Sequence, residues 1–369
     1  MITIFNIRPK GFNIGNDAIG IALRNQVFKA FGRIVNIIDL PATSHYESHS
    51  KAGLTAKTIN EINRYGDGVI IGGGNLYENN ELALDVNALK HLRVPLMLFS
   101  LSRGKVYNRR LELCERTDTM PDASLLALNK AAQYSLARDS TTKSYLDNLG
   151  CVGVKLGYCP TIFLSDLNSN LARLPDAEVP GVLISIRTPS LMNIPLRLQS
   201  NIQAEIESII DDLRSRGFGR IRILCNDSRD IEFATVFQGT KKVDYVYTAD
   251  VYGYLSLLKE AELVISYRLH ASLPCLSFGT PVVMLSYDER ASSLIEDLGF
   301  GEWDINLTEG STIKNVQSRL DSIDNLTELR KKTKALWDSI SDIQHKEMKN
   351  FSEEVVSYAR SSHAIYSKF

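Results

Sequence analysis

One stretch of the chain, from Leu263 to Gly299, repeats a single local pattern twice and restricts the fold more than any other feature. Leu263 to Tyr267 is a short apolar run typical of a buried strand, and Ala271 to Phe278 has helical spacing up to a glycine. Pro281 to Tyr287 is a second apolar run, and a charged turn connects it to another helix. Strand, charged turn and helix in alternation predict a parallel α/β sheet.

The charged turns of this stretch carry the side chains best suited to chemistry. Arg268, Leu269 and His270 follow the first strand, and Arg290 follows the second. In parallel α/β sheets, ligands bind beyond the carboxyl ends of the strands. We therefore expect Arg268, His270 and Arg290 at the mouth of a binding site.

The same alternation runs through both halves of the 369-residue chain, a length that favours two domains. It stops between the halves, where Asn, Asp, Ser and Pro predominate. We predict an N-terminal domain over residues 1–165, a linker over 166–180, a C-terminal domain over 181–345 and a C-terminal helix over 346–369. The expected fold is α/β, with two doubly wound Rossmann-like domains that face each other across a cleft, as in the GT-B arrangement.

The junction between the first predicted strand and the first helix, expected from about Asp17 to Phe31, reads Gly15-Asn16-Asp17. An Asn or Asp at such a place is first of all a helix N-cap. A second interpretation is that the free N–H groups of the helix start face an anionic ligand, beside Asn16 and Asp17. The segment G-F-N-I-G-N does not match the dinucleotide fingerprint G-x-G-x-x-G, so no nicotinamide cofactor is predicted.

Three glycines, Gly72 to Gly74, directly follow another predicted buried strand and precede Asn75. Glycines let the backbone adopt a positive φ and let a ligand or a neighbouring strand approach closely. The run lacks the Lys-Ser/Thr of a P-loop, so a nucleoside triphosphate site is not predicted. Glycine-rich turns after strands also occur for purely structural reasons.

Arg138 and Arg268 occupy equivalent places, since each ends a strand and precedes a helix, one in each half. If the domains face each other, both guanidinium groups can point into one cleft. The planar guanidinium group can form bidentate hydrogen bonds to a carboxylate or a phosphate. The alternative for either arginine is a surface ion pair, which contributes only ~0–1 kcal/mol to stability. For His270 two roles remain possible: it acts as a general acid or base, or it has only a structural role at the start of a helix.

Charge and composition exclude several classes of protein. The chain has 42 basic and 43 acidic residues, without the basic excess typical of nucleic-acid binding. Five scattered cysteines predict reduced thiols, and His45 and His49 in a polar loop are expected to be solvated, so no metal site is predicted. The absence of a signal-peptide pattern and of an apolar run of ~18 residues predicts a cytoplasmic protein, with loose association at the inner face of the membrane left open.

Five short segments, in the same order, resemble the polysaccharide pyruvyl transferase family. They are Gly15–Ile19, Gly72–Leu76, Ala137–Ser140, Gly157–Thr161 and the stretch that contains Arg268–Ala271, Gly279–Pro281 and Tyr287–Asp288. The resemblance spans about residues 1 to 300.

This resemblance implies transfer of the enolpyruvyl group of phosphoenolpyruvate onto two hydroxyls of a sugar, in a polysaccharide or its precursor, with release of phosphate. Phosphoenolpyruvate is then the donor substrate, no cofactor is needed, and the acceptor is a glycan, with a lipid-linked glycan among the options. The acceptor is expected at the N-terminal domain and the donor at the C-terminal domain. The implied proton-transfer residue is His270, and the implied substrate-binding residues are Arg138, Arg268, Leu269, Arg290, Asn16, Asp17, Gly73, Gly74 and Asn75.

Two other functions stay open. A GT-B glycosyltransferase that uses a nucleotide sugar shares the architecture and the cationic cleft, although the second half shows no acidic pair after a glycine-rich turn to hold a sugar and a ribose. A non-catalytic relative that binds an anionic glycan would leave Arg268 and His270 with a structural role only. Binding of a nucleoside diphosphate but not of phosphoenolpyruvate would favour the glycosyltransferase over pyruvyl transfer.

Overall fold

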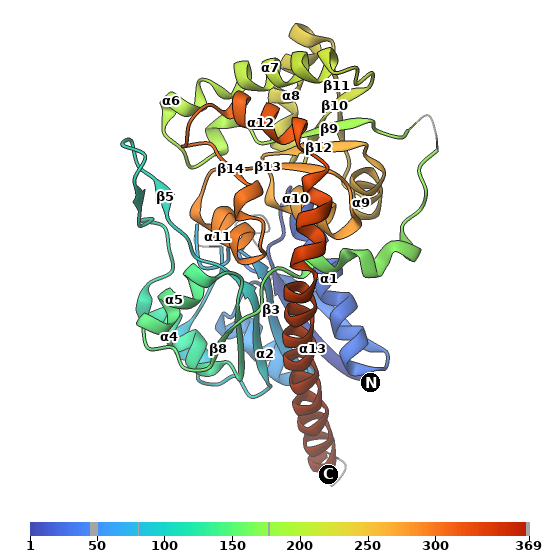
Figure 1. Ribbon diagram of the computed structural model, residues 1–369. Coiled ribbons are helices and arrows are strands. Elements are labelled where there is room, and N and C mark those ends of the chain that lie inside the picture. The colour runs from blue at the N-terminus through green and yellow to red at the C-terminus, as the bar shows by residue number, and fades with distance from the viewer. Residues whose placement is uncertain (45–50, 80, 176–177, 367–369) are drawn as a thin grey trace.

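Two parallel sheets form the centres of two halves of the molecule in the computed structural model, which describes residues 1–44, 51–79, 81–175 and 178–366 (Figure 1). His45 and His49 lie outside the described residues. The first sheet has the order β2 (Val35–Pro41), β1 (Ile2–Arg8), β3 (Gly68–Gly74), β4 (Leu96–Leu101), β7 (Tyr134–Ala137) and β8 (Val154–Leu156). The second has the order β11 (Asp244–Tyr247), β10 (Ile221–Cys225), β9 (Val182–Ile186), β12 (Leu263–Ser266), β13 (Val282–Ser286) and β14 (Ile305–Asn306).

All neighbouring strands in both sheets are parallel, which confirms the predicted α/β class with two sheet-centred halves. Central strands such as β3, β4, β9, β12 and β13 are buried along their whole length, as expected for parallel strands covered by helices on both faces.

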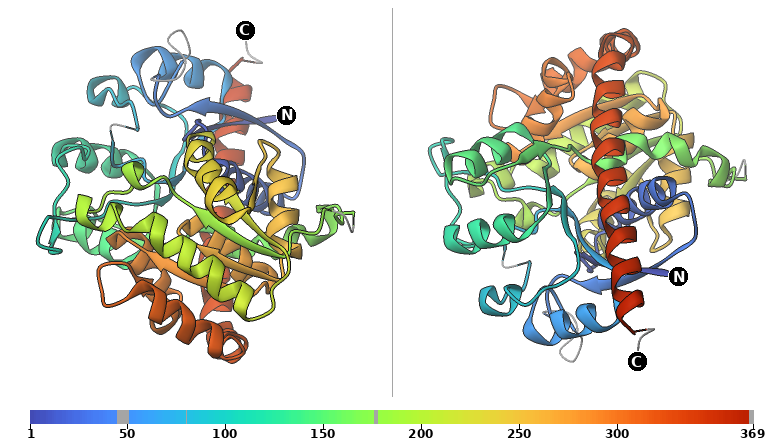
Figure 2. Two further views of the ribbon diagram at one scale, coloured as in Figure 1. Left: turned by 90° about the horizontal axis from the view of Figure 1, so that it is seen from above. Right: turned by 90° about the horizontal axis from the view of Figure 1, so that it is seen from below.

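Helices connect the strands and cover the sheets (Figures 1 and 2). In the first half they are α1 (Ile14–Phe31), α2 (Ala56–Tyr65), α3 (Val86–Leu89), α4 (Asp122–Ala131) and α5 (Ser140–Asn148). In the second half they are α6 (Leu196–Gln199), α7 (Ile202–Ser215), α8 (Ile231–Lys241), α9 (Val251–Glu260), α10 (Leu269–Phe278), α11 (Glu289–Asp297) and α12 (Thr312–Asp321). The 3-10 segments are η1 (Pro160–Asn170), η2 (Pro189–Leu191), η3 (Ser228–Asp230) and η4 (Gly301–Trp303).

An antiparallel hairpin, β5 (Val106–Tyr107) and β6 (Leu113–Cys114), projects from the first half toward the second. Asn306 Nδ2 donates a hydrogen bond of 2.8 Å to Tyr107 Oη, so the hairpin contacts the end of β14. Strands of two residues carry no detectable alternation, so the sequence pattern does not reveal this hairpin.

Helix α1 belongs to both halves of the molecule. Toward the first sheet it packs so tightly that a Cβ atom on Gly73 would lie 2.2 Å from Ile19 Cγ2. Its N-terminal residues, including Ile14 and Ala18, share one apolar cluster with Tyr254 and Leu273 of the second half. The start of α1 is thereby fixed at the interface where the two sheets meet.

A second link between the halves is α13 (Asn325–Tyr366), a single helix that crosses the boundary set at residue 345 in the sequence analysis (Figure 2, right). Its N-terminal part packs on the second half, where the rings of Trp337 and Phe300 make an edge-to-face contact with 5.8 Å between their centroids. Its C-terminal part packs on the first half through Phe351 and Val355. The helix continues because no proline or glycine interrupts residues 325 to 366.

The connection between the halves begins with η1, which spans the boundary expected at residue 165. The backbone N–H of Ser165, the last residue of the expected N-terminal domain, donates to Ser277 Oγ of α10 at 2.9 Å. Within the expected linker, the N–H of Leu174 donates to Glu260 Oε1 at 3.0 Å, so both segments pack on the second half. In the part of the chain that the structure describes, no helix is both long and apolar enough to cross a membrane.

Candidate active site

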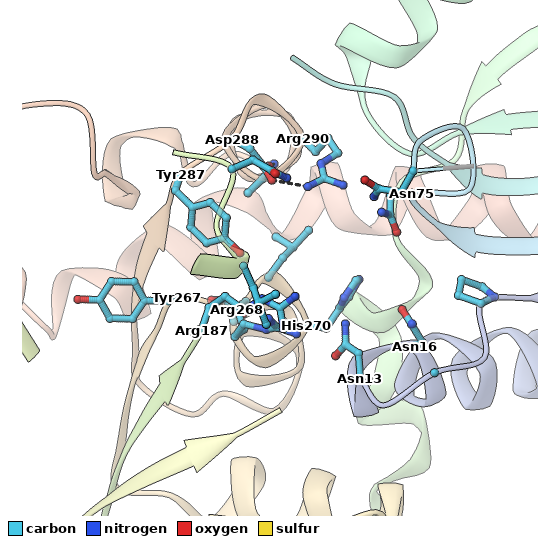
Figure 3. Close-up of a pocket in the computed structure, with 18 of the residues that line it drawn as sticks. Asn13, Asn16, Asn75, Arg187, Tyr267, Arg268, His270, Tyr287, Asp288 and Arg290 are labelled. Carbon is cyan, nitrogen blue, oxygen red and sulfur yellow. Dashed lines mark hydrogen bonds and ion pairs between the residues drawn. The ribbon is translucent and has the colours of Figure 1, made fainter. Parts of the chain in front are cut away.

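The two halves enclose a cavity of about 350 Å³ between the carboxyl ends of their strands (Figure 3). Its walls include residues that follow β1, β3 and β7 of the first sheet and β9, β12 and β13 of the second. The carboxyl edges of both sheets, where ligands bind in parallel α/β folds, therefore border the same cavity, as the sequence predicts for a two-domain cleft.

Arg138 and Arg268 both line this cavity, one from each half. Arg138 follows β7 and is 3% exposed, and Arg268 follows β12 and is 8% exposed. Within the described ranges, neither guanidinium group has a hydrogen-bond or ion-pair partner, and Arg138 Nε is fully buried without one. Buried positive charge without a partner is costly, so this arrangement favours an anion between the two side chains.

His270 lies in the first turn of α10, between Arg268 and the amide side chains of Asn13 and Asn16 (Figure 3). Burial, together with the charges of Arg138, Arg268 and Arg290, lowers the pKa of His270 to about 3. Its Nε2 atom is buried without a hydrogen-bond partner among the described residues. In the ligand-free protein His270 is therefore neutral near pH 7.

Arg290 also lines the cavity, but its guanidinium group is engaged by two carboxylates. It forms ion pairs with Asp288 at 2.5 Å and with Glu78, a fully buried residue of the first half, at 2.7 Å. Burial opposes the charged form of Arg290, yet Asp288 and Glu78 outweigh it and raise the pKa of Arg290. Arg290 thus joins the two halves, whereas Arg138 and Arg268 retain their capacity for a ligand.

Removing the charge of Glu78 tests the structural role of this ion pair. Glu78→Gln is expected to lower the free energy of unfolding by about 3 kcal/mol, because it breaks a buried pair and leaves Arg290 undercompensated. Chemical denaturation measures the change. Glu328→Gln removes an exposed partner of Lys331 and is expected to change the free energy far less, so equal effects of the two variants would contradict a buried link between the halves.

The start of α1 differs from the sequence prediction by one turn. The helix begins at Ile14, and its N-cap is Asn13, whose side chain accepts from the N–H of Gly15 at 3.1 Å. The prediction of Asn16 or Asp17 as the cap is therefore wrong, because a hydrogen bond from the N–H of Ile14 to the carbonyl oxygen of Asn226 in the second half fixes the helix start at Ile14. Asn16 lines the cavity from the first turn.

Asp17 is oriented toward the first sheet, and its carboxylate pairs with Arg8 at 2.8 Å. It is not among the residues that line the cavity, and neither are Gly73 and Gly74. Gly73 and Gly74 have φ values of 77° and 90° and turn the chain at the end of β3, with Gly73 against α1. Asn75, which follows this turn, does line the cavity, as does Leu269.

The structure also places residues in the cavity that the sequence analysis does not select. Arg187 directly follows β9 and pairs with Asp227 at 3.1 Å, while burial and the neighbouring charge of Arg268 lower the pKa of Arg187. Its signal in the sequence is an arginine at a strand end, as for Arg138. Tyr287, which points toward Arg268 in Figure 3, has no charge to single it out and enters the sequence analysis only through the Tyr287–Asp288 segment of the family resemblance.

Chemically, the site combines an anion-binding pair of arginines, a neutral histidine and a wall of amide side chains. Such a site can bind a carboxylate or phosphate beside a group that accepts a proton, and amides can hydrogen-bond sugar hydroxyls. Among the residues that the structure describes, no three His, Cys, Asp or Glu side chains are arranged to hold a metal ion.

Comparisons with known structures support the architecture. The chain is similar to UDP-GlcNAc 2-epimerase from Neisseria meningitidis bound to UDP-GlcNAc, with a TM-score of 0.57, 11% identity, and coverage of 98% of this chain and 100% of that one. UDP-N-acetylglucosamine 2-epimerase from Rickettsia bellii gives a TM-score of 0.55 and 12% identity, with coverage of 98% and 96%. The Methanocaldococcus jannaschii UDP-GlcNAc 2-epimerase complex with UDP-GlcNAc and UDP gives 0.54 and 12%, with coverage of 87% and 92%.

At these identities the likeness concerns the fold alone, and it confirms two Rossmann-like domains in a GT-B-like arrangement. A comparison with curated protein sequences finds no match.

The family comparison is specific: the sequence profile of the polysaccharide pyruvyl transferases matches residues 13–289, which include Arg138, Arg268 and His270. The chain therefore belongs to the polysaccharide pyruvyl transferase family and is a transferase.

Proposed function

We propose that this transferase moves the enolpyruvyl group of phosphoenolpyruvate onto two hydroxyls of a glycan and forms a cyclic pyruvate ketal. The observation that carries the proposal is the pair of buried arginines, Arg138 and Arg268, whose guanidinium groups have no partner in the described part of the chain and lie beside a neutral His270. Phosphoenolpyruvate has a carboxylate and a phosphate, and each can take a bidentate hydrogen bond from one guanidinium group.

The reaction needs proton transfer at two places. Carbon 3 of the donor takes up a proton, and one sugar hydroxyl adds to carbon 2 as it loses its own proton. The bond between carbon 2 and the phosphate oxygen then breaks, and the second hydroxyl adds to carbon 2. The proton lost by one hydroxyl thus compensates for the proton that carbon 3 takes up to become a methyl group. The proton lost by the other hydroxyl leaves on hydrogen phosphate.

In the ligand-free protein the low pKa of His270 keeps its ring neutral but makes it a weak base. His270 can therefore accept the proton of the attacking hydroxyl only when the bound donor has raised this pKa toward the operating pH. The donor carries about three negative charges near neutral pH, which would compensate the arginines that disfavour the imidazolium ion. The same residue can then hold the proton that it has accepted. The N–H groups at the start of α10 lie beside Arg268 and can help to stabilise the leaving phosphate.

Donor binding should therefore raise the pKa of His270 from about 3 toward its ordinary value of roughly 6.5. At about pH 6 the complex is then expected to take up part of a proton. Calorimetric titrations of phosphoenolpyruvate in buffers with different ionisation enthalpies measure this uptake. The donor's own phosphate titrates in both proteins, so the decisive quantity is the difference between the wild type and His270→Gln, and no difference would contradict this role.

The activity itself is tested by incubating the protein with phosphoenolpyruvate and a panel of glycans. The expected result is phosphate release that depends on both substrates, together with a glycan whose mass increases by one pyruvate ketal. Binding of a nucleoside diphosphate without binding of phosphoenolpyruvate would contradict the proposal and favour nucleotide-sugar chemistry. A lipid-linked glycan belongs in the panel, as part of the same proposal.

A further inference from the structure

The backbone of His270 is held by a chain of buried hydrogen bonds. Tyr254 Oη, in α9, donates to the carbonyl oxygen of His270 at 2.9 Å. Asn226 Nδ2 donates to the same Tyr254 Oη at 2.7 Å, and Ser185 Oγ donates to Asn226 Oδ1 at 2.8 Å. Ser185, Asn226 and Tyr254 are each fully buried, so water does not compete for these bonds.

The same Asn226 also holds the other half of the molecule. Its backbone carbonyl accepts a hydrogen bond of 2.9 Å from the N–H of Ile14, the first residue of α1. The adjacent residues Asn13 and Asp227 form an isolated antiparallel bridge. Asn226 therefore connects the start of α1 directly, and the start of α10 through Tyr254, across the interface between the halves.

Gly15 brings α1 into direct contact with His270. A Cβ atom at position 15 would lie 2.7 Å from His270 Cβ and 3.2 Å from its Cγ, closer than side-chain atoms pack. Gly15 has a helical backbone within α1, so the need for glycine comes from this close approach and not from backbone conformation. A larger residue would have to displace either α1 or the imidazole ring.

We propose that Gly15, Asn226 and Tyr254 are positioning residues, which couple the seating of α1 on the second half to the location of the His270 side chain. The inference rests on the proposed function only in that His270 transfers a proton. Its structural content is separate: the imidazole ring occupies its place between Arg268 and the start of α1 only when α1 is fully seated. A purely structural role would lower stability without moving the ring.

The chain offers a matched pair of substitutions within one helix. Gly15→Ala places a Cβ atom 2.7 Å from His270 Cβ and 3.2 Å from Asn13 Oδ1. The atoms nearest to a Cβ at position 20 belong to the Arg8 side chain and lie at 3.5 Å or more, an ordinary contact. Both changes add the same methyl group to α1, and alanine favours a helix more than glycine does. A difference between them at His270 therefore reports the contact and not the helix.

The first readout is the nuclear magnetic resonance signal of the His270 ring in protein labelled at histidine Cε1. The chain has six histidines, and His270→Gln assigns the signal. The signal is expected to shift in Gly15→Ala and in Tyr254→Phe, which removes only the hydroxyl, and to stay unchanged in Gly20→Ala. This readout needs no substrate, so it remains decisive even if phosphoenolpyruvate is not the donor.

The second readout is steady-state kinetics with phosphoenolpyruvate and the acceptor. Because a displacement of about 1 Å can cost on the order of 100-fold in rate, kcat should fall by about 10- to 100-fold in Gly15→Ala and Tyr254→Phe. The KM for phosphoenolpyruvate should change less than about threefold, since the arginines remain. If Gly15→Ala does not fold, Tyr254→Phe decides. Wild-type signals and a wild-type kcat in Tyr254→Phe would overturn the proposal.

Discussion

Arg268→Ala is expected to weaken phosphoenolpyruvate binding by about 100-fold, which corresponds to roughly 3 kcal/mol. Arg268 contributes a buried guanidinium group, and its loss leaves one end of the donor, carboxylate or phosphate, without a charged partner. Calorimetric titration of the purified variant measures the dissociation constant directly. Arg138→Ala should behave similarly, because Arg138 approaches the same cavity from the other half.

An arginine outside the cavity provides the control for this loss of charge. Arg110 is exposed in the turn between β5 and β6, and Arg110→Ala should bind phosphoenolpyruvate like the wild type. Far-ultraviolet circular dichroism and thermal unfolding establish that each variant is folded. An Arg268→Ala protein that is folded and binds the donor with unchanged affinity would refute the assignment of Arg268.

His270→Gln is expected to bind phosphoenolpyruvate with nearly unchanged affinity and to lose about 10²- to 10⁴-fold in turnover. Glutamine keeps a polar group of similar reach but does not accept a proton. Removing the histidine leaves Arg138 and Arg268 in place, so binding and chemistry should separate. The measurement combines calorimetry for the donor with phosphate release in the presence of the acceptor.

His345, exposed on α13, serves as the matched control for this substitution. His345→Gln should turn over like the wild type. Normal turnover by His270→Gln would show that His270 only supports the start of α10. A parallel loss of donor affinity and turnover would instead place His270 in binding.

The two-sheet architecture and two arginines of the site, Arg138 and Arg268, follow from local sequence patterns. Alternating apolar runs and helical spacing are sufficient to predict two parallel sheets, and strand-ending arginines identify Arg138 and Arg268. These predictions succeed because a parallel sheet places every strand end at the same edge. The same rule applied consistently would also have selected Arg187.

Long-range partners account for what the sequence analysis did not anticipate. Arg290 follows its strand as expected, but its engagement by Glu78 depends on a contact between residues 212 positions apart. No local pattern reveals such a contact. Gly73 illustrates the same point, since it lies against Ile19 with a positive φ and does not line the cavity.

The position of the first helix shows a different limit. Asn13, Asn16 and Asp17 are all suitable N-caps, and the sequence alone does not rank them. In the structure, the hydrogen bond from Ile14 to Asn226 fixes the helix start at Ile14. A contact with the second half thus decides a local feature of the first.

A crystal structure of the protein with phosphoenolpyruvate tests the central claim most directly. The predicted result is a donor molecule in the cavity between the halves, with its carboxylate and phosphate bound by Arg138 and Arg268 and its reacting carbons beside His270. Phosphoenolpyruvate bound elsewhere, or a cavity that excludes it while both arginines keep their present positions, would contradict the account.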